Sequence, residues 1–596
     1  MPPIRRSNNK TTVSHQALPY TTGSSRTRRR NKPAEQAEPV VSPTQVDELA
    51  TLRREFNHIT VLPRAHFYKP VSNSLRIADP DPLILEYNNI SPPPVPDLRV
   101  EQFTFICACN KVEMIHLKLF DRPVRTPLPE HNEAIGLAAE ITAEILHLPR
   151  LLRFPDVEDL SSVNFAPGAF AGIHYALQGK PIRANADALA QNDAEIAFDS
   201  LLNGEYVAPH DVRMGGRGKI AEVPDGVARE QPPPVGRLIL MLSHRDLKMC
   251  GVTEKQLTRA YSQPEYPIAV GQSWFHGGSQ QFLERMAPYK TWYCFDAKKF
   301  DSNIDPWMVR VAIKIIRGQY YEGFDAKYDA YWNFIFDSLV EAPIYRDDGI
   351  RFQKYVGTTS GHSHNTLVES IITILLGYAT LITMHPELTK EEIRQDAWME
   401  SLGDDNIMAL KGKLLGHSVE DIATVMHTAF GIDWFGKKSF ATTRLLDPHH
   451  GDFQGVQFLG KYWYLGDYPL ETKVIKLPLP YRPAKETYLS LLFPEHGKLE
   501  PTNTYLRVLL KYMDAAGNRP MEAWLSGLLD WLETRRVEIP DNLPSHSRRI
   551  VSGVYRNVRG EMPRPKRINF LRWRDLVVLP REEYRRAWSG GRSRGY

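Results

Sequence analysis

Short apolar runs alternate with acidic residues in two parts of the chain. The aromatic run Thr291–Phe295 predicts a strand that ends at Asp296. Further along, the apolar runs Trp398–Leu402 and Asn406–Leu410 flank Gly403-Asp404-Asp405, which predicts a hairpin with two carboxylates at its tip. Both acidic positions lie where a strand ends, and connections of this kind often present polar groups to a ligand.

A helix is predicted directly after the first strand. Asp305 and Pro306 form an expected N-cap and first helical turn. Trp307, Val311 and Ile315 then follow at helical spacing, so we expect them on the buried face.

The longest apolar run is Ile371–Met384, about 14 residues interrupted by threonines and Gly377. A membrane-spanning helix needs about 20 such residues. The run therefore predicts a buried helix beginning near Asn365, and no membrane segment. The preceding Gly357-Thr-Thr-Ser360-Gly361 is a loop of small residues that either caps this helix or lets backbone and hydroxyls approach sugar or phosphate.

Composition limits the class of protein. The 596 residues are 42% hydrophobic and 24% charged, which is typical of globular proteins and fits three to five domain-sized units or one large enzyme. Four cysteines are too few for a disulfide scaffold and fit a reducing compartment. The first 40 residues lack the apolar segment of a secretory signal, whereas a basic transit peptide stays open.

Charge is unevenly distributed along the chain. Residues 1–40 carry a balance of +6 and residues 548–596 a balance of +10, which leaves −12 for residues 41–547 out of the total of +4. Basic ends on an acidic body point to a polyanionic partner. The first end is either a solvated tail, a nucleic-acid arm or both, and the second interleaves arginines with Tyr555, Phe570 and Trp573, as suits single-stranded RNA or a solvated surface.

The paired carboxylates suggest metal chemistry. Gly-Asp-Asp alone occurs by chance in about one chain in ten of this composition, so a plain surface turn is the alternative. Adjacent carboxylates repel each other unless a cation lies between them, and Mg²⁺ takes one or two carboxylates with substrate phosphates. If Asp296 and Asp404 come together, they form a two-metal site, where one ion activates an attacking 3′-hydroxyl and the other steadies leaving pyrophosphate.

The order of these motifs resembles that of viral RNA-dependent RNA polymerases, most closely those of double-stranded RNA viruses of the partitivirus type. Motifs A, B and C are matched by Asp296 with Asp301, by Ser360-Gly361 with Asn365, and by Gly403-Asp404-Asp405. Further similar segments, which extend the resemblance over roughly residues 213–465, are Val235–Ile239 (motif F), Ile268–Trp274 with Gly277-Gly278, Phe435–Ser439 (motif D) and Val456–Gly460 (motif E).

The resemblance implies an α+β right-hand fold with fingers, a palm built on an antiparallel sheet, and a thumb, helix-rich outside the palm. The expected division of the chain is a basic disordered tail (1–45), an N-terminal extension with fingers (46–290), palm with motif A (291–306), a fingers or palm insertion (307–359), palm with motifs B to E (360–465), thumb (466–547) and a basic C-terminal extension (548–596).

The resemblance also implies roles for individual residues. Asp296 and Asp404 would be metal ligands, with Asp405 as an accessory ligand, for two Mg²⁺ ions that Mn²⁺ can replace. Asp301 would contact the ribose 2′-hydroxyl with help from the motif B residues, and Arg237 would contact the triphosphate. The motif D lysine, Lys438 in preference to Lys437, would protonate pyrophosphate or steady its charge. The expected substrate-binding set is Asp301, Arg237, Ser360, Gly361, Asn365 and Glu369.

Motif B departs from the family pattern. Asn365 stands where Thr is usual, and Glu369 where Asp or Asn is usual, so the contact of this longer carboxylate with Asp301 or the sugar is in question. His362 and His364 replace small or aromatic residues; a zinc site is the alternative for such a pair, but no third ligand is evident nearby.

Arg213–Lys219 is a glycine-rich basic segment before motif F. It lacks the spacing of a P-loop. We expect it to be a loop that lines the nucleotide or template entry, or else a flexible solvated loop.

Together these features predict an RNA-directed RNA polymerase that copies and transcribes a viral genome. Expected partners are RNA template and product, ribonucleoside triphosphates and coat protein, with no membrane, in the virion interior or host cytoplasm. One alternative is a reverse transcriptase, which Leu402-Gly403 before the acidic pair and Asp301 disfavour. The other is a nucleic-acid-binding coat protein with basic arms, which has no need for the Asp constellation.

Overall fold

The computed structural model describes residues 43–228, 231–434, 438–470, 473–495, 499–539, 543–556, 559, 561 and 565–588. The chain divides into two units, Met1–Val46 and Asp47–Tyr596. Only the start of a helix is described in the first unit, so the architecture below is that of the second.

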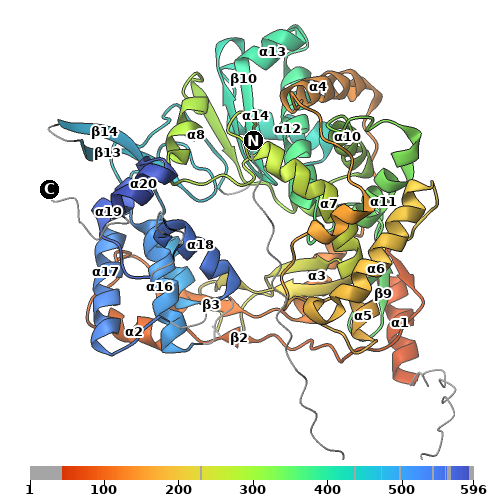
Figure 1. Ribbon diagram of the computed structural model, residues 1–596, viewed down its shortest axis with the longest axis horizontal. Helices are drawn as coiled ribbons and strands as arrows, with labels where there is room; N and C mark the ends of the chain where they lie inside the picture. Colours follow the sequence, from red (N-terminus) through yellow and green to blue (C-terminus); the bar gives the residue numbers. More distant parts are fainter. Residues whose placement is uncertain are drawn as a thin grey trace, which may run out of the picture. The chain divides into compact units, whose positions relative to one another are not determined.

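Helices and strands are interspersed along the whole described chain (Figure 1). The helices are α1 Pro43–Glu55, α2 Pro82–Asn88, α3 Asn110–Leu117, α4 Asn132–Ile145, α5 Ile173–Ala176, α6 Arg183–Leu202, α7 His244–Tyr261, α8 Gly278–Met286, α9 Phe300–Asn303, α10 Pro306–Arg317, α11 Asp329–Val340, α12 Asn365–Met384, α13 Lys390–Asp396, α14 Val419–Phe430, α15 Ala484–Leu492, α16 Pro501–Ala515, α17 Arg519–Thr534, α18 Ser545–Tyr555, α19 Phe570–Val578 and α20 Arg581–Trp588. The strands are β1 Thr60–Leu62, β2 Ile77–Ala78, β3 Phe103–Ile106, β4 Val212–Arg217, β5 Lys219–Glu222, β6 Arg237–Met241, β7 Thr291–Phe295, β8 Ile344–Tyr345, β9 Arg351–Gln353, β10 Ala397–Leu402, β11 Asp405–Leu410, β12 Phe440–Thr442, β13 Tyr462–Leu470 and β14 Lys473–Tyr481.

The predicted strands around the acidic residues form one antiparallel sheet, in the order β10-β11-β7-β12. β7 spans the predicted aromatic run, and β10 pairs with β11 through a two-residue turn in which Leu402 faces Asp405. β7 adds to the other side of β11, with Phe295 opposite Asn406. The strand and the hairpin predicted from sequence are therefore both confirmed, and they are neighbours.

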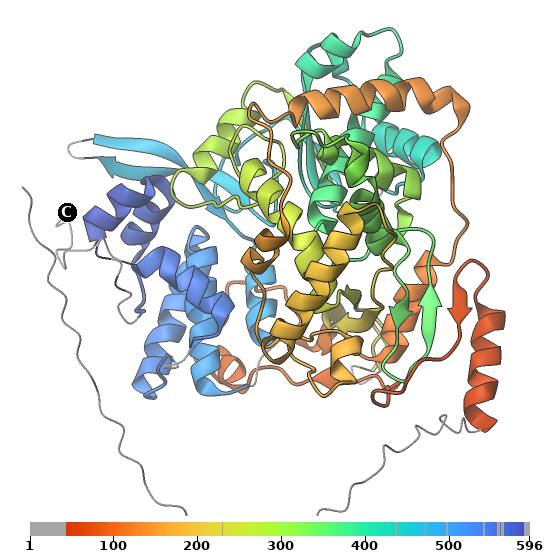
Figure 2. The same ribbon diagram turned by 45° about the vertical axis from the view of Figure 1, so that its right-hand side comes forward.

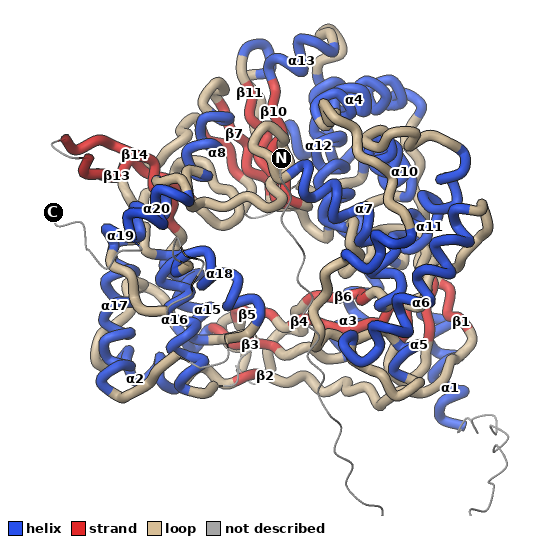
Figure 3. Tube along the Cα trace, in the orientation of Figure 1, coloured by secondary structure: helices blue, strands red, loops and turns tan. Residues whose placement is uncertain are grey.

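Side chains of this sheet alternate between two apolar cores. Tyr293 and Phe295 of β7 pack in a core with α10, α12 and α14, whereas Trp292 and Cys294 point to a second core that includes Phe282 of α8. This period of two is what a strand buried on both faces requires. Figure 3 shows the sheet lying between α8 on one side and α12 on the other.

α12 is the central helix of the larger core. It begins at Asn365 and ends at Met384, and nearly every side chain beyond its first turn is buried, as the apolar run predicted. By length and composition alone it could cross a membrane, but 83% of its most apolar window is buried inside the protein. A helix buried on all sides is expected to be apolar all round.

The prediction that Arg213–Lys219 is a glycine-rich loop is wrong, because this segment forms β4 and the start of β5. β4 lies in a five-stranded sheet of order β1-β9-β8-β4-β6. A Cβ on Gly216 would lie 2.8 Å from the carboxylate of Glu113 in α3, so the glycine serves close packing of a helix on the strand.

Segments distant in sequence meet in this fold. β1 pairs with β9, almost 300 residues later (Figure 2). α2 packs among the C-terminal helices, where the indole Nε1 of Trp524 donates to the carbonyl of Ser91 at 2.9 Å and its ring meets Tyr87 edge-on. The apolar core of the C-terminal helices therefore includes part of the N-terminal chain.

The C-terminal basic segment does not present all its aromatic residues for stacking. Trp573 is fully buried and its Nε1 donates to the carbonyl of Met513 at 2.8 Å, and Tyr555 is also buried. Amphipathic helices place their aromatic side chains inward and their arginines toward solvent. The expected use of Trp573 and Tyr555 in stacking on RNA is therefore wrong.

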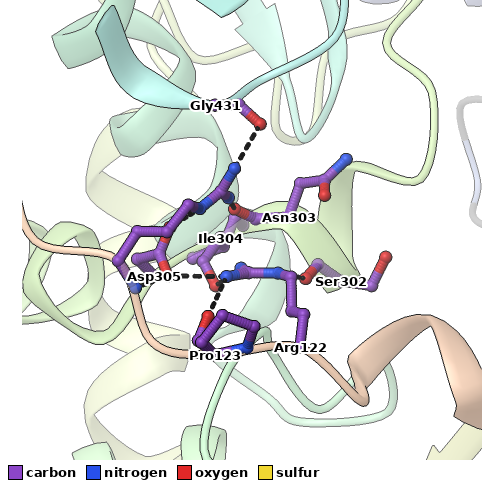
Figure 4. A network of polar contacts seen from close by, with 8 residues as sticks. Arg122, Pro123, Ser302, Asn303, Ile304, Asp305 and Gly431 are labelled. Atoms are coloured by element: carbon purple, nitrogen blue, oxygen red, sulfur yellow. Dashed lines mark hydrogen bonds and ion pairs between the residues drawn. The ribbon is translucent and has the colours of Figure 1, made fainter.

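Asp305 precedes α10 as predicted, with Pro306 in the first turn, but its carboxylate does not cap the helix. Asp305 is buried and accepts from Arg122 Nη1 at 2.8 Å and from Arg125 Nε at 2.9 Å (Figure 4). The two guanidinium groups also donate to backbone carbonyls of residues 302–304. The N-terminal segment thus fixes the chain that leads from motif A into α10. On α10, Trp307 and Val311 are half-buried and pack against the larger core, and Ile315 is buried in it.

Replacing Asp305 by Ala should lower the free energy of unfolding by about 2–3 kcal/mol, because two arginines then lose their buried counter-charge but keep carbonyl acceptors. Urea denaturation would measure the change. Asp199→Ala on the exposed side of α6 is the control and should shift stability by less than about 0.5 kcal/mol. Equal effects of the two substitutions would contradict the anchoring role.

Candidate active site

Three predicted metal ligands meet at one end of the four-stranded sheet. Asp296 follows the last residue of β7, and Asp405 is the first residue of β11, next to the Asn406–Phe295 pair. Asp404 is in the turn between β10 and β11. Burial and the charge of Asp296 raise the pKa of the Asp405 carboxyl, so the two carboxylates are close enough to repel.

Three buried hydroxyls hold the turn that carries Asp404. The amide N–H of Gly403 donates to Ser370 Oγ at 2.8 Å, and its carbonyl accepts from Thr373 Oγ1 at 2.8 Å and Ser401 Oγ at 3.0 Å. Gly403 has φ +66°, a left-handed conformation that favours glycine. Ser370 and Thr373 lie on α12, so this helix fixes the acidic hairpin. The sequence contained no clear signal for them, since Thr373 only interrupts the apolar run and Ser370 lies directly before it.

Asp404 reaches solvent but is surrounded by protein on several sides. This partial burial, together with the charges of Asp405 and Asp301, raises its pKa to about 6. Its carbonyl accepts from Asn406 Nδ2 at 2.8 Å, which fixes the backbone beside it. An electrostatic environment of this kind binds cations.

Three basic side chains face the acidic group. Arg237 at the start of β6 lowers the pKa of both Asp404 and Asp405, and Lys438 acts on Asp405 in the same way. Lys219 of β5 is the third: burial and the charges of Arg237 and Lys438 lower its pKa, and Asp296 opposes this. Lys219 was not among the predicted site residues, although it lies in the basic segment before motif F. The alternative Lys437 lies outside the described residues.

Asp301 is tied to the loop before α12 through its backbone. Its carbonyl accepts from the amide of Thr358 at 3.0 Å, and the hydroxyl of Thr358 donates to Glu369 Oε1 at 2.8 Å. Asn365 Nδ2 donates to the same oxygen at 3.0 Å. Burial and the charge of Asp301 raise the pKa of Glu369, so the longer side chain does reach the neighbourhood of Asp301.

Ser360 and Gly361 bind the strand that carries Arg237. The hydroxyl of Ser360 accepts from the amide of Leu240 at 3.1 Å, and Gly361 N donates to the Leu240 carbonyl at 3.0 Å. A Cβ on Gly361 would lie 2.3 Å from that carbonyl oxygen. These two residues therefore join the loop to β6, whereas contact with a substrate stays a prediction.

Segments resembling motifs D and E support the backbone of β7. The amide of Asp296 donates to Ser439 Oγ at 2.9 Å, and the same hydroxyl donates to the carbonyl of Trp434. Gln457 N approaches the sulfur of Cys294 at 3.5 Å. Both flanking segments thus contact the strand that ends at Asp296.

A histidine from the N-terminal part also belongs to this neighbourhood. His116 is half-buried on α3, and its pKa is lowered by burial and by Lys219 and Lys299, while Asp301 raises it. Residues 46–200 contained no recognisable motif, and an isolated histidine in them gave no signal of a role.

The donor chemistry of the acidic group fits Mg²⁺. Within the described ranges no three His, Cys, Asp or Glu side chains converge closely enough to hold a metal ion unaided. Mg²⁺ is typically bound by one or two carboxylates together with water and substrate phosphates. Asp296, Asp404 and Asp405 can supply the carboxylates. His362 and His364 are instead buried in the core. The Nε2 of His362 lies 2.9 Å from the hydroxyl of Ser338, and that of His364 lies 3.1 Å from the hydroxyl of Thr253.

Comparison with known proteins gives the family of the central region. Residues 249–428 match the family model of viral RNA-dependent RNA polymerase. This polymerase-family region contains Asp296, Asp301, the loop before α12 and the acidic hairpin, whereas Arg237 and Lys438 lie outside it. The predicted resemblance to viral RNA-dependent RNA polymerases is therefore confirmed for this region.

Viral polyproteins resemble the same part of the chain. Identity is 29% over 146 residues with the genome polyprotein of Beet mosaic virus, 30% over 146 residues with that of Zucchini yellow mosaic virus (strain Reunion Island), and 29% over 150 residues with that of Lettuce mosaic virus. These alignments cover 24–25% of this chain and 4–5% of the polyproteins. The chain thus matches only a small part of these curated relatives.

Replacing Ser370 by Ala should destabilise the protein by about 1–3 kcal/mol, because the buried amide of Gly403 loses its acceptor. Thr380→Val is the matched control: it lies on the same helix and is equally buried, but its hydroxyl donates to Leu376 of its own helix. Urea denaturation of both variants checks this. A smaller loss for Ser370→Ala than for the control would contradict the role given to this hydroxyl.

Proposed function

We propose that the protein is an RNA-directed RNA polymerase, a nucleotidyltransferase that replicates and transcribes a viral RNA genome. The observation that carries the proposal is the meeting of Asp296 with Asp404 and Asp405 at one sheet end, opposite Arg237 and Lys438. The polymerase-family region around these acids supports it. An acidic cluster that faces basic side chains is suited to divalent cations and a triphosphate together.

Asp296 and Asp404 are the proposed metal ligands, with Asp405 as accessory ligand, for two Mg²⁺ ions or Mn²⁺ in their place. Bound there, the ions supply activation of a 3′-hydroxyl and charge stabilisation of departing pyrophosphate. The protein's own contribution is to hold the carboxylates: Ser370 and Thr373 fix the turn of Asp404, and Ser439 fixes the amide of Asp296.

The basic side chains receive the triphosphate in this proposal. Arg237 suits bidentate contact with phosphate oxygens, and Lys219 adds charge beside it. Lys438 is the proposed proton donor to pyrophosphate, or the side chain that balances its charge. The proposal is supported by the charge of Lys438, which acts, like that of Arg237, on both Asp405 and Lys219.

Asp301 is the proposed acceptor for the ribose 2′-hydroxyl. Thr358, whose amide binds the Asp301 carbonyl, donates its hydroxyl to Glu369, and Asn365 donates to the same carboxylate. Ser360 and Gly361 join the loop to β6 on this side of the site. A site that hydrogen-bonds a substrate hydroxyl discriminates against a substrate lacking it. The alternative, a reverse transcriptase, is disfavoured by an acidic rather than aromatic residue at 301.

The finer assignments are also proposals. In the right-hand arrangement the four-stranded sheet belongs to the palm, residues 46–290 include the fingers, and residues 466–547 form the thumb. The resemblance of the wider motif pattern implies a partitivirus-like double-stranded RNA virus, whereas the curated relatives are genome polyproteins of mosaic viruses. Coat protein as partner and a place in the virion or host cytoplasm are implied by the same resemblance. A nucleic-acid-binding coat protein stays the alternative from another class.

The Asp404→Ala variant should lose Mg²⁺-dependent incorporation of ribonucleotides on a primed RNA template, by about 10³-fold or more, because a metal ligand is removed. Its circular dichroism and affinity for the template should match wild type. Asp199→Ala serves as the exposed control and should keep full activity. Full activity in Asp404→Ala would contradict the assignment.

Asp301→Ala should reduce the preference for ATP over dATP on a poly(U) template by about 10–100-fold, the value of one hydrogen bond to a charged acceptor. Steady-state kcat/KM for both nucleotides provides the ratio. An unchanged ratio, with activity retained, would remove the ribose role from Asp301.

A further inference from the structure

Lys354 is a lysine buried completely in the protein, beside but not within the set of motif residues. Its Nζ donates to three carbonyls: Val340 at 2.7 Å, Leu339 at 3.1 Å and Gly357 at 3.3 Å. The first two are the last residues of α11, whose carbonyls have no partner within the helix. One ammonium group thus joins a helix end to the loop before α12.

The loop reached by Lys354 is the one that holds Asp301. Gly357 has φ +70°, and a Cβ there would lie 2.5 Å from the carbonyl oxygen of Asp301 and 2.4 Å from Phe120. Gly357 N donates to the carbonyl of Ile304 at 2.8 Å, and Thr358 N donates to that of Asp301 at 3.0 Å. The loop therefore lies directly against the backbone of the motif A turn.

The connection continues to the side chains around the sugar site. From Thr358 it passes to Glu369 and Asn365 through the hydrogen bonds described above. The second end of the loop is fixed independently, since Thr359 Oγ1 donates to Leu339 at 2.8 Å. Lys354 and Thr359 thus share one carbonyl at the end of α11, and that carbonyl acts as a common anchor.

Burying an ammonium group is expensive, and an apolar side chain of the same length would fill the space at lower cost. Burial lowers the pKa of Lys354 to about 7, while the charges of Glu341 and then Asp301 favour its protonated form. The charge of Asp301 thus acts on this lysine in addition to the chain of hydrogen bonds.

We propose that Lys354 is a positioning residue for sugar selection, which sets the place of Asp301 through the loop from Gly357 to Thr359. It does not touch the substrate in this proposal. The inference rests on the proposed polymerase function and on Asp301 as reader of the ribose. It adds to that function a residue at the end of α11 that affects sugar selection without contacting the substrate.

The test compares two buried lysines. Lys354→Met removes the ammonium group that donates to the three carbonyls. Lys248→Met removes an equally buried lysine on α7, whose Nζ lies 2.8 Å from Asp187 Oδ1. Both variants should lose stability in urea denaturation. Only Lys354→Met should also lower the ratio of kcat/KM for ATP over dATP on poly(U) with Mg²⁺, by about fivefold or more, the effect of one displaced hydrogen bond.

Lys354→Gln provides a second variant, which keeps a donor for one carbonyl and should show a smaller drop in the ratio. Wild type without any incorporation would overturn the proposed function and this inference with it. A lowered ratio in Asp301→Ala beside unchanged ratios in active Lys354→Met or Lys354→Gln would overturn the inference alone. The same drop in Lys248→Met would also overturn it, because general destabilisation would then explain the effect.

Discussion

Repulsion between carboxylates is the constraint on which this structure depends. Asp296, Asp404 and Asp405 meet at one end of a sheet, where burial together with the charge of a neighbouring acid raises the pKa values of Asp404 and Asp405. Such a cluster would separate on a flexible loop. Here each acid is attached to backbone that is fixed elsewhere: the hairpin turn by hydroxyls of α12, and the end of β7 by Ser439. The fold therefore holds the three acids in place before any ligand binds.

The sequence predicted the parts of this arrangement that are local. A run of aromatic residues and a two-residue turn between apolar arms have short-range signatures, so β7, the acidic hairpin and α12 could be identified before the structure was known. The match of the central region to viral polymerases agrees with the motif order. The pairing of β7 with the acidic hairpin could be expected only from the resemblance, because no local sequence pattern pairs β7 with β11.

Long-range partners explain what the sequence could not provide. Asp305 appeared to be a helix cap, but two arginines about 180 residues earlier compete for its carboxylate. Gly215 and Gly216 suggested a loop, whereas the absence of a side chain at Gly216 lets α3 pack against a strand. Thr373 appeared only as an interruption of an apolar run and Ser370 as the residue before it, whereas their hydroxyls bind the backbone of Gly403.

The packing of α2 among the C-terminal helices has a consequence for the order of folding during synthesis. Asp81 accepts from Thr504 Oγ1, a residue made 423 positions later. At typical translation rates the ribosome needs about 20–80 s to add that much chain. Throughout this time the apolar residues around α2 lack their final partners, so the nascent protein exposes an unfinished core. A chaperone that covered this surface during synthesis would protect it from aggregation.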